Sequence, residues 1–310
     1  MITCSAPGKI YLFGEHAVVY GQPAIACAID RRVFTSVKLS DSRRFTIDSA
    51  GTRRNCPSEE FSYACCAAQA VKELAEGDFG AEIAIRSQLP PSQGLGSSAA
   101  VTVSTIKALT ECLGITLQNE EIARIGYKVE LKLQGKASPT DTFVSAIGGA
   151  AIVERSRPAR LVRLDEPVII GATGITRSTG DVIGSVALMK QQYPSLIGSI
   201  MSSIGDITRL GQNKLTKKDV AGIGELMNIN QGLLESLGVS DIALCKLIHA
   251  ARNAGALGAK LTGAGRGGCM FAIARERDVD AVSEAMVREG AQVIKTAFSD
   301  SGLQIERQRM

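Results

Sequence analysis

The sequence predicts an α+β protein of two domains, and three observations lead to this prediction. The chain has 310 residues with 45% hydrophobic content, which is enough material for two cores. Strand-like and helix-like patterns are mixed along its length. Between the two halves, residues 155–167 are charged and contain two prolines. We therefore place the boundary in this stretch and expect domains at 1–165 and 166–310.

In the first half, short β-branched or alternating segments predict strands, and apolar residues at helical spacing predict helices. The expected strands are 2–6, 24–29, 33–39, 45–47, 81–86 and, after a glycine pair, 150–153. The expected helices are 61–74, 99–112 and 119–133. The last of these has acidic residues in its first turn and Gly135 just after its end, which are typical start and stop signals.

The second half opens with an apolar strand at 168–172 and continues with long amphipathic helices. The expected helices are 181–192, 196–210, 218–237 and 241–253. The end of the chain reads as a strand at 259–262, a glycine loop at 263–268, a strand at 269–274, a helix at 278–290 and a strand at 291–297.

Composition narrows the functional classes. A net charge of +4 without dense basic runs, 4% aromatic residues and no tryptophan argue against a nucleic-acid partner and favour a small anionic ligand. No apolar run reaches the length of a membrane span, and residues 1–5 lack the features of a signal peptide, which predicts a cytoplasmic protein.

The cysteines give no sign of a metal site. Eight are present without a C-x-x-C pair, and there are only two histidines, which argues against bound zinc. Cys27, Cys112 and Cys269 lie in apolar stretches and are expected to be small core residues. We expect the thiols to be reduced.

The most informative stretch is a glycine and serine loop at 90–100 that runs into the helix expected at 99–112. Glycines let the backbone approach a ligand closely, and a helix N-terminus offers free N–H donors and a positive dipole end. Hydroxyls there could bond phosphate oxygens or magnesium. The loop fits a phosphate site, and simple capping of a buried helix fits it equally well.

Residues 90–100 match two other known types of phosphate-binding loop less well. It is not a P-loop, because no Gly-Lys-Ser/Thr follows the glycines. Gly94, Gly96 and Ala99 match G-x-G-x-x-A, which suggests an NAD-dependent dehydrogenase. In that fold, however, the glycines directly follow a strand early in the chain, whereas the strand expected at 81–86 ends well before this loop.

Three further segments carry polar residues whose simplest roles would be structural. Residues 6–21 contain Lys9, which could be a solvated turn residue, and the pair Glu15–His16, which could be a surface dyad. Residues 136–141 form a turn with Asp141 after the third helix, and 260–269 form a second glycine loop that could be a hairpin. A non-catalytic binding module would tolerate the loss of Asp141, Lys9 or Glu130, and the presence of all three argues against such a module.

In their order along the chain, these segments resemble the GHMP kinase family. The motifs are P-G-K-x-x-L-x-G-E-H from Pro7, P-P-x-x-G-L-G-S-S-A-A from Pro90 and K-L-T-G-A-G-x-G-G-C from Lys260, and the resemblance covers residues 6–269. It implies a mixed α/β N-terminal domain and a C-terminal ferredoxin-like domain with added helices. ATP and the acceptor would lie in the cleft between them.

Residues 14–21 are most similar to family members that act on mevalonate. The resemblance implies ATP- and Mg2+-dependent transfer of the γ-phosphoryl group to the primary hydroxyl of mevalonate. The product would be 5-phosphomevalonate, an isoprenoid precursor, and a homodimer is a further expectation. The nearest alternative is another small-molecule kinase of the family, acting on phosphomevalonate or a sugar.

The resemblance also assigns roles by motif position. The nucleotide phosphates would contact Pro91, Gly94, Leu95, Gly96, Ser97, Ser98 and Ala99. Ser98 and Glu130 would hold Mg2+, although Glu130 could equally be a charge on a wet helix face. Asp141 would accept the proton of the acceptor hydroxyl, with Lys9 beside it offsetting charge on the migrating group.

The substrate side is expected to include Glu15, His16, Ser138, Arg177 and Thr179. Ser178 or Thr179 could instead cap the helix expected from 181. Family members that act on mevalonate commonly read P-S-G-x-D before the aspartate, whereas this chain has Pro139 in place of the glycine. Because proline fixes φ and lacks an N–H, we expect a different turn geometry at Ser138.

Overall fold

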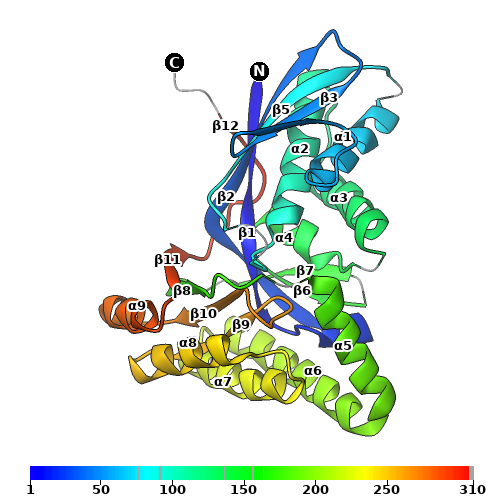
Figure 1. Ribbon diagram of the computed structural model, residues 1–310. Coiled ribbons are helices and arrows are strands. Elements are labelled where there is room, and N and C mark those ends of the chain that lie inside the picture. Colours follow the sequence, from blue (N-terminus) through cyan, green and yellow to red (C-terminus); the bar gives the residue numbers. More distant parts are fainter. Residues whose placement is uncertain are drawn as a thin grey trace.

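The computed structural model describes residues 1–75, 77–90, 93–135, 137–155, 157–162, 164–176 and 178–306. It contains a larger mixed sheet with helices on one face and a smaller antiparallel sheet with a helical layer beneath it (Figure 1). Among the described residues, none of the helices combines the length and apolar character needed to cross a membrane.

The larger sheet is built around two long neighbouring strands. Its members are β1 (Ile2–Phe13), β2 (Ala24–Ser40), β3 (Phe45–Ser49), β4 (Thr52–Asn55), β5 (Gly80–Ser87), β6 (Ala150–Glu154), β7 (Arg157–Leu161) and β12 (Gln304–Glu306). The main strand order is β12-β1-β2-β5-β3-β4, and β6 pairs with β2 and β7. The strands expected at 24–29 and 33–39 are one strand, and β4, β7 and β12 were not expected.

Helices α1 (Ser62–Leu74), α2 (Ser97–Leu113), α3 (Asn119–Gln134) and α4 (Thr140–Ile147) lie on one face of this sheet (Figure 1). α2 packs directly on β1 and β2. It begins and ends at glycines in the left-handed conformation, Gly96 and Gly114. The start and stop signals of α3 are confirmed, with a capping box at Gln118 and Glu121 and Gly135 at the C-cap. α4 was not expected, and its first two residues lie in the stretch 136–141 that was expected to be a turn.

The smaller sheet has the strand order β11-β8-β10-β9, with antiparallel neighbours throughout. Its strands are β8 (Pro167–Ala172), β9 (Gly258–Thr262), β10 (Cys269–Ile273) and β11 (Gln292–Ala297). Its helices are α5 (Thr179–Gln192), α6 (Pro194–Thr216), α7 (Val220–Ser236), α8 (Ile242–Asn253) and α9 (Val279–Arg288). In chain order these elements give the ferredoxin-like arrangement with added helices between β8 and β9, as expected.

The core links the two sheets. Along β8, Val168 and Ile170 belong to a hydrophobic cluster that continues into the larger sheet, whereas Ile169 belongs to a second cluster with α5–α9. Successive side chains on a strand point to opposite faces, so each face of the smaller sheet has its own apolar partner. The two halves of the chain therefore pack together through continuous apolar contact.

The expectation of reduced thiols is wrong for one pair of cysteines. Cys56 and Cys65 form a disulfide that ties the segment before α1 to the first turn of that helix. The predicted core role is confirmed for Cys27 and Cys269, and burial raises the pKa of each thiol to about 12. Cys112 is half-buried at the edge of the core.

Candidate active site

Lys9 and Asp141 come from distant parts of the chain and form an ion pair. Their Nζ and Oδ2 atoms lie 3.1 Å apart. Lys9 belongs to β1 and only 2% of it is exposed, so it is not the solvated turn residue that Pro7 and Gly8 suggested. The Asp141 side chain keeps 26% of its surface exposed. The carboxylate is thus anchored on one side and accessible to a ligand on the other.

Asp141 stands in the first turn of α4, where a negative charge interacts favourably with the helix dipole. Pro139 occupies the N-cap with a φ of −67°. Proline is tolerated at a helix start because the first N–H groups have no partner within the helix. Replacing a motif glycine by proline is therefore compatible with a helix that presents the aspartate.

The glycine and serine loop lies against β1. The backbone N–H of Lys9 donates to the carbonyl oxygen of Leu95 over 2.8 Å. Gly96 has a φ of +74°, and a Cβ there would lie 2.6 Å from Lys9 Cγ. Ser97 and Ser98 begin α2 and are half-buried, and Ala99 is buried beneath them. The loop therefore presents a helix N-terminus next to the Lys9–Asp141 pair.

Gly96→Ala should reduce both stability and turnover, because the new methyl group needs a left-handed backbone and displaces the Lys9 side chain. Gly114→Ala is the matched control, since Gly114 has a φ of +71° at the other end of α2 and its Cβ would meet nothing within 4 Å. Thermal unfolding and kcat measure the effects. Both variants should lose about 1 kcal/mol or more of stability, and only Gly96→Ala should lose kcat. Equal kcat values would contradict this account.

Glu130 lies inside the site and not on a wet helix face, because only 3% of it is exposed. Burial, reinforced by the nearby Asp141 charge, raises the pKa of its carboxyl to about 8, while Lys9 and a hydrogen bond with Ser98 act in the opposite direction. A buried carboxyl next to a hydroxyl is an oxygen donor set of the kind that Mg2+ binds. A cation here would favour the ionised form.

Because folding raises the pKa of Glu130 from 4.5 to about 8, the folded protein holds this proton more tightly than the unfolded chain. The stabilisation is present below pH 4.5 and is lost as the pH rises to about 8. Glu130→Gln cannot ionise, so it should be less sensitive to this rise. Thermal unfolding of both proteins without metal or nucleotide measures the difference, and parallel curves would contradict the raised pKa.

Glu15 is enclosed by the protein. Its carboxylate pairs with Lys260 of β9, both side chains are at most 1% exposed, and Asn230 Nδ2 donates to Glu15 Oε2 over 3.3 Å. The expected substrate role of Glu15 stays a prediction. The sequence motifs include Lys260 but did not assign it a role. Its place at the start of the motif K-L-T-G-A-G is the signal that could have identified it as a site residue.

His16 is also buried, and its Nε2 lies 2.8 Å from the carbonyl oxygen of Ala264 in the second glycine loop. Burial lowers the pKa of His16. Its other ring nitrogen, Nδ1, is buried and has no hydrogen-bond partner among the described residues. The expected substrate role of His16 stays a prediction.

The second glycine loop lies against the first. A Cβ on Gly263 would be 3.2 Å from Gly94 Cα, and the carbonyl oxygen of Gln93 lies 3.3 Å from the position of a Cβ on Gly268. Thr262, just before this loop, accepts the backbone N–H of Tyr11 at Oγ1 over 2.8 Å. The loop is thus packed against both the glycine and serine loop and β1, and it is not an isolated hairpin.

The remaining predicted residues are more dispersed. Ser138 lines a cavity of about 100 Å³ between the turn before Asp141 and the segment after β1. Ser178 caps α5 by accepting the N–H of Asp181, so the capping alternative is confirmed, and Thr179 is the exposed first residue of that helix. Pro91 and Arg177 lie outside the described residues.

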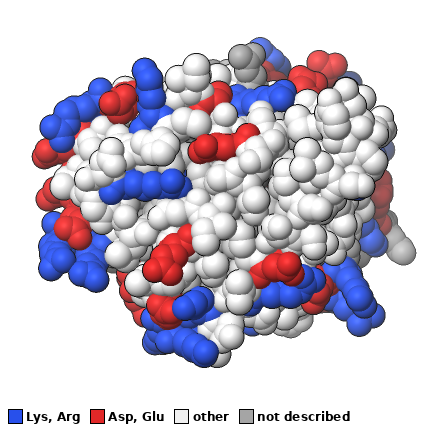
Figure 2. Space-filling view, turned by 90° about the horizontal axis from the view of Figure 1, so that it is seen from below, with Lys and Arg blue, Asp and Glu red and all other residues white. Residues whose placement is uncertain are grey.

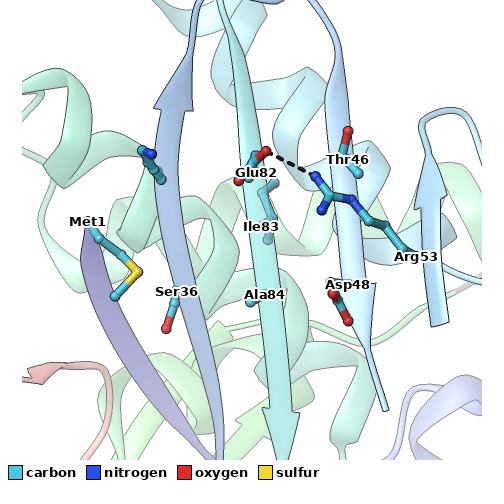
Figure 3. A pocket seen from close by; sticks show the side chains of 9 residues that line it. Met1, Ser36, Thr46, Asp48, Arg53, Glu82, Ile83 and Ala84 are labelled. Atoms are coloured by element: carbon cyan, nitrogen blue, oxygen red, sulfur yellow. Dashed lines mark hydrogen bonds and ion pairs between the residues drawn. The ribbon is translucent and has the colours of Figure 1, made fainter. Parts of the chain in front are cut away.

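A second hollow, of about 150 Å³, lies on the open face of the larger sheet (Figure 3). Its polar lining residues Lys38, Asp48 and Glu82 alternate along their strands with buried apolar residues of the opposite face. It includes none of the predicted site residues. We therefore place the candidate active site at the Lys9–Asp141 pair and the glycine and serine loop before α2.

Comparison with known proteins agrees with this geometry. Residues 62–149 match the GHMP kinases N terminal domain, and residues 213–292 match GHMP kinases C terminal. A mevalonate kinase of Thermococcus onnurineus (strain NA1) is 40% identical in an alignment of 329 positions that covers 98% of each chain. The chain belongs to the GHMP kinase family. A mevalonate kinase of Pyrococcus abyssi (strain GE5 / Orsay) is also 40% identical, over 100% of this GHMP kinase and 99% of the relative.

Solved structures give the same result for this GHMP kinase. The Methanococcus jannaschii mevalonate kinase superimposes with a TM-score of 0.85 at 28% identity, covering 96% of this chain and 98% of that one. The L. major mevalonate kinase in complex with R-mevalonate has a TM-score of 0.84 at 28% identity and covers 96% of both chains. The two-domain fold expected from the motifs is therefore confirmed.

Proposed function

We propose that this GHMP kinase transfers the γ-phosphoryl group of ATP to the primary hydroxyl of mevalonate, giving 5-phosphomevalonate for isoprenoid precursor biosynthesis. The observation that carries the proposal is the Lys9–Asp141 ion pair beside the N-terminus of α2. Full-length identity of 40% to mevalonate kinases supports the choice of acceptor. Helix capping and phosphate binding, the two roles considered for the glycine and serine loop, are then compatible, because the same stretch of backbone can serve both roles.

In the proposed mechanism, Asp141 orients the acceptor hydroxyl and accepts its proton as the oxygen–phosphorus bond forms. Lys9 keeps the carboxylate in place and offsets negative charge on the transferred group. The transition state of phosphoryl transfer is loose and highly charged, so positioning and electrostatic stabilisation account for most of the catalysis. The backbone N–H groups of Gly96, Ser97 and Ser98 would bind the phosphates.

We also propose Mg2+ as the cofactor. Ser98 and Glu130 would hold the ion, and the buried position of the Glu130 carboxyl beside the Ser98 hydroxyl supports this assignment. When bound, the ion would neutralise charge on the ATP phosphates. Glu15, His16, Ser138, Arg177 and Thr179 remain proposed substrate-side residues.

A coupled assay of ADP release tests the proposal directly. With ATP and Mg2+, mevalonate should be turned over, whereas phosphomevalonate, galactose and homoserine should be poor acceptors. Calorimetry should show binding of ATP and none of NAD, which separates a kinase from a dehydrogenase. Absence of mevalonate turnover would reject the proposed substrate, and turnover of another acceptor would replace it.

The organisation of the chain is part of the proposal. We propose functional units at 1–165 and 166–310, a cytoplasmic location and a homodimer. Self-association is supported by exposed apolar residues on α5–α8, namely Leu188, Leu196, Ile229 and Ile242. Figure 2 shows broad uncharged areas on the face seen from below. Cell fractionation and light scattering test these two points; a monomer in solution would exclude the dimer.

A further inference from the structure

Tyr11 lies beneath the proposed reaction centre and has no role in the mechanism described so far. It stands two residues after Lys9 on β1, so both side chains point to the same face of the sheet. Its hydroxyl donates to Asp141 Oδ1 over 2.8 Å, and its ring centroid lies 4.0 Å from Lys9 Nζ. Tyr11 is 8% exposed. One buried aromatic side chain therefore contacts both members of the ion pair.

These contacts leave little freedom to the Asp141 carboxylate. Lys9 bonds Oδ2 and Tyr11 bonds Oδ1, so each oxygen has its own donor on β1. A general base works only when its free lone pair faces the proton that it removes, and small errors in position are costly. A carboxylate held at one oxygen alone could rotate about its side-chain bonds.

Tyr11 is itself held in place through its backbone, and two further hydroxyls stand at the start of α4. Thr140 precedes Asp141 there, and the hydroxyls of Ser138 and Thr140 lie 2.6 Å apart. The Tyr11 backbone N–H donates to Thr262 Oγ1 at the end of β9. Burial and the Asp141 charge raise the pKa of Tyr11, so the hydroxyl keeps its proton and remains a donor.

We propose that Tyr11 is a positioning residue for Asp141, and that its hydroxyl, together with Lys9, fixes the carboxylate in the orientation that phosphoryl transfer requires. The proposal rests on the function proposed above. Thr262 extends the support into the second domain, so the two sheets jointly determine where the aspartate points.

Tyr11→Phe tests the proposal because it removes one hydroxyl and keeps the ring beneath Lys9. We expect kcat to fall about 10- to 100-fold, the effect of losing one hydrogen bond to a charged group. The KM values for ATP and mevalonate should stay within about twofold, because neither substrate loses a contact. Tyr193→Phe is the control, since Tyr193 is half exposed between α5 and α6.

A double variant separates positioning from general destabilisation. In an Asp141→Asn background, Tyr11→Phe should cause little further loss of the residual rate, because the group that it orients has already been removed. Thermal unfolding of each variant checks that the protein is folded. Unchanged kcat in Tyr11→Phe, or a loss that is fully additive with Asp141→Asn, would overturn the proposal. Failure of the unmodified enzyme to use mevalonate would reject the proposed function instead.

Discussion

Asp141→Asn should lower kcat about 10²- to 10⁴-fold, the contribution expected of a general base in a positioned site. The amide has nearly the same shape as the carboxylate but cannot accept the proton of the acceptor hydroxyl. Affinity for ATP should stay within about twofold, because the proposed phosphate contacts come from the glycine and serine loop and the start of α2, whereas Asp141 belongs to α4. Single-turnover rates and nucleotide calorimetry measure the two quantities separately.

Asp206→Asn is a suitable control for this experiment. Asp206 also pairs with a cation, Arg209, but on the exposed surface of α6. Its replacement should leave both the rate and the ATP affinity unchanged, since exposed ion pairs contribute little. A wild-type rate in Asp141→Asn would remove this residue from its proposed role. Equal losses of rate and of ATP affinity would indicate damage to the whole site.

Lys260→Met should lower the free energy of unfolding by about 3–5 kcal/mol, the cost of breaking a buried ion pair. The substitution leaves the Glu15 carboxylate without its cation in a site where both side chains are almost completely buried. The hydrogen bond from Asn230 remains but cannot compensate for a full charge. Thermal and urea unfolding measure the loss.

Two comparisons make this result specific. Lys295→Met removes the cation of the exposed Lys295–Asp280 pair and should cost at most about 1 kcal/mol. Adding Glu15→Gln to Lys260→Met should restore much of the lost stability, because it removes the stranded charge. If Lys260→Met and Lys295→Met were equally mild, Glu15 would have to be neutral or solvated in the folded protein.

Elements with strong local signals could be predicted from the sequence. The acidic first turn and terminal glycine of α3 predicted its ends, and apolar runs predicted the succession of strands and helices in the second half. The ferredoxin-like arrangement of those strands was implied by the resemblance to the family. β2 was expected to be two strands because Asp30, Arg31 and Arg32 interrupt its apolar pattern. Hydrogen bonds from the Arg32 guanidinium to Ser5 and Gly302 allow the strand to continue through that polar region.

The site was harder to predict, because its geometry depends on contacts between distant residues. The motifs identified Lys9 and Asp141, but Pro7–Gly8 and Pro139 suggested turns where the structure has a strand and a helix. Tyr11 and Lys260 have partners more than a hundred residues away, and no local pattern reveals such pairs. Burial of Lys9 and Glu130 is likewise a property of the assembled fold.

The short strand β12 pairs with β1, joining Thr3 to Glu306 and Ser5 to Gln304. The segment before it lies against the end of α4, where the N–H of Leu303 donates to the carbonyl oxygen of Ala146 and a Cβ on Gly302 would lie 2.2 Å from that oxygen. The helix that carries the proposed base is therefore supported by residues that follow β11, the last strand of the smaller sheet. Contacts between such remote segments form slowly. A nascent chain should thus acquire its catalytic competence late, after both sheets have been synthesised and docked.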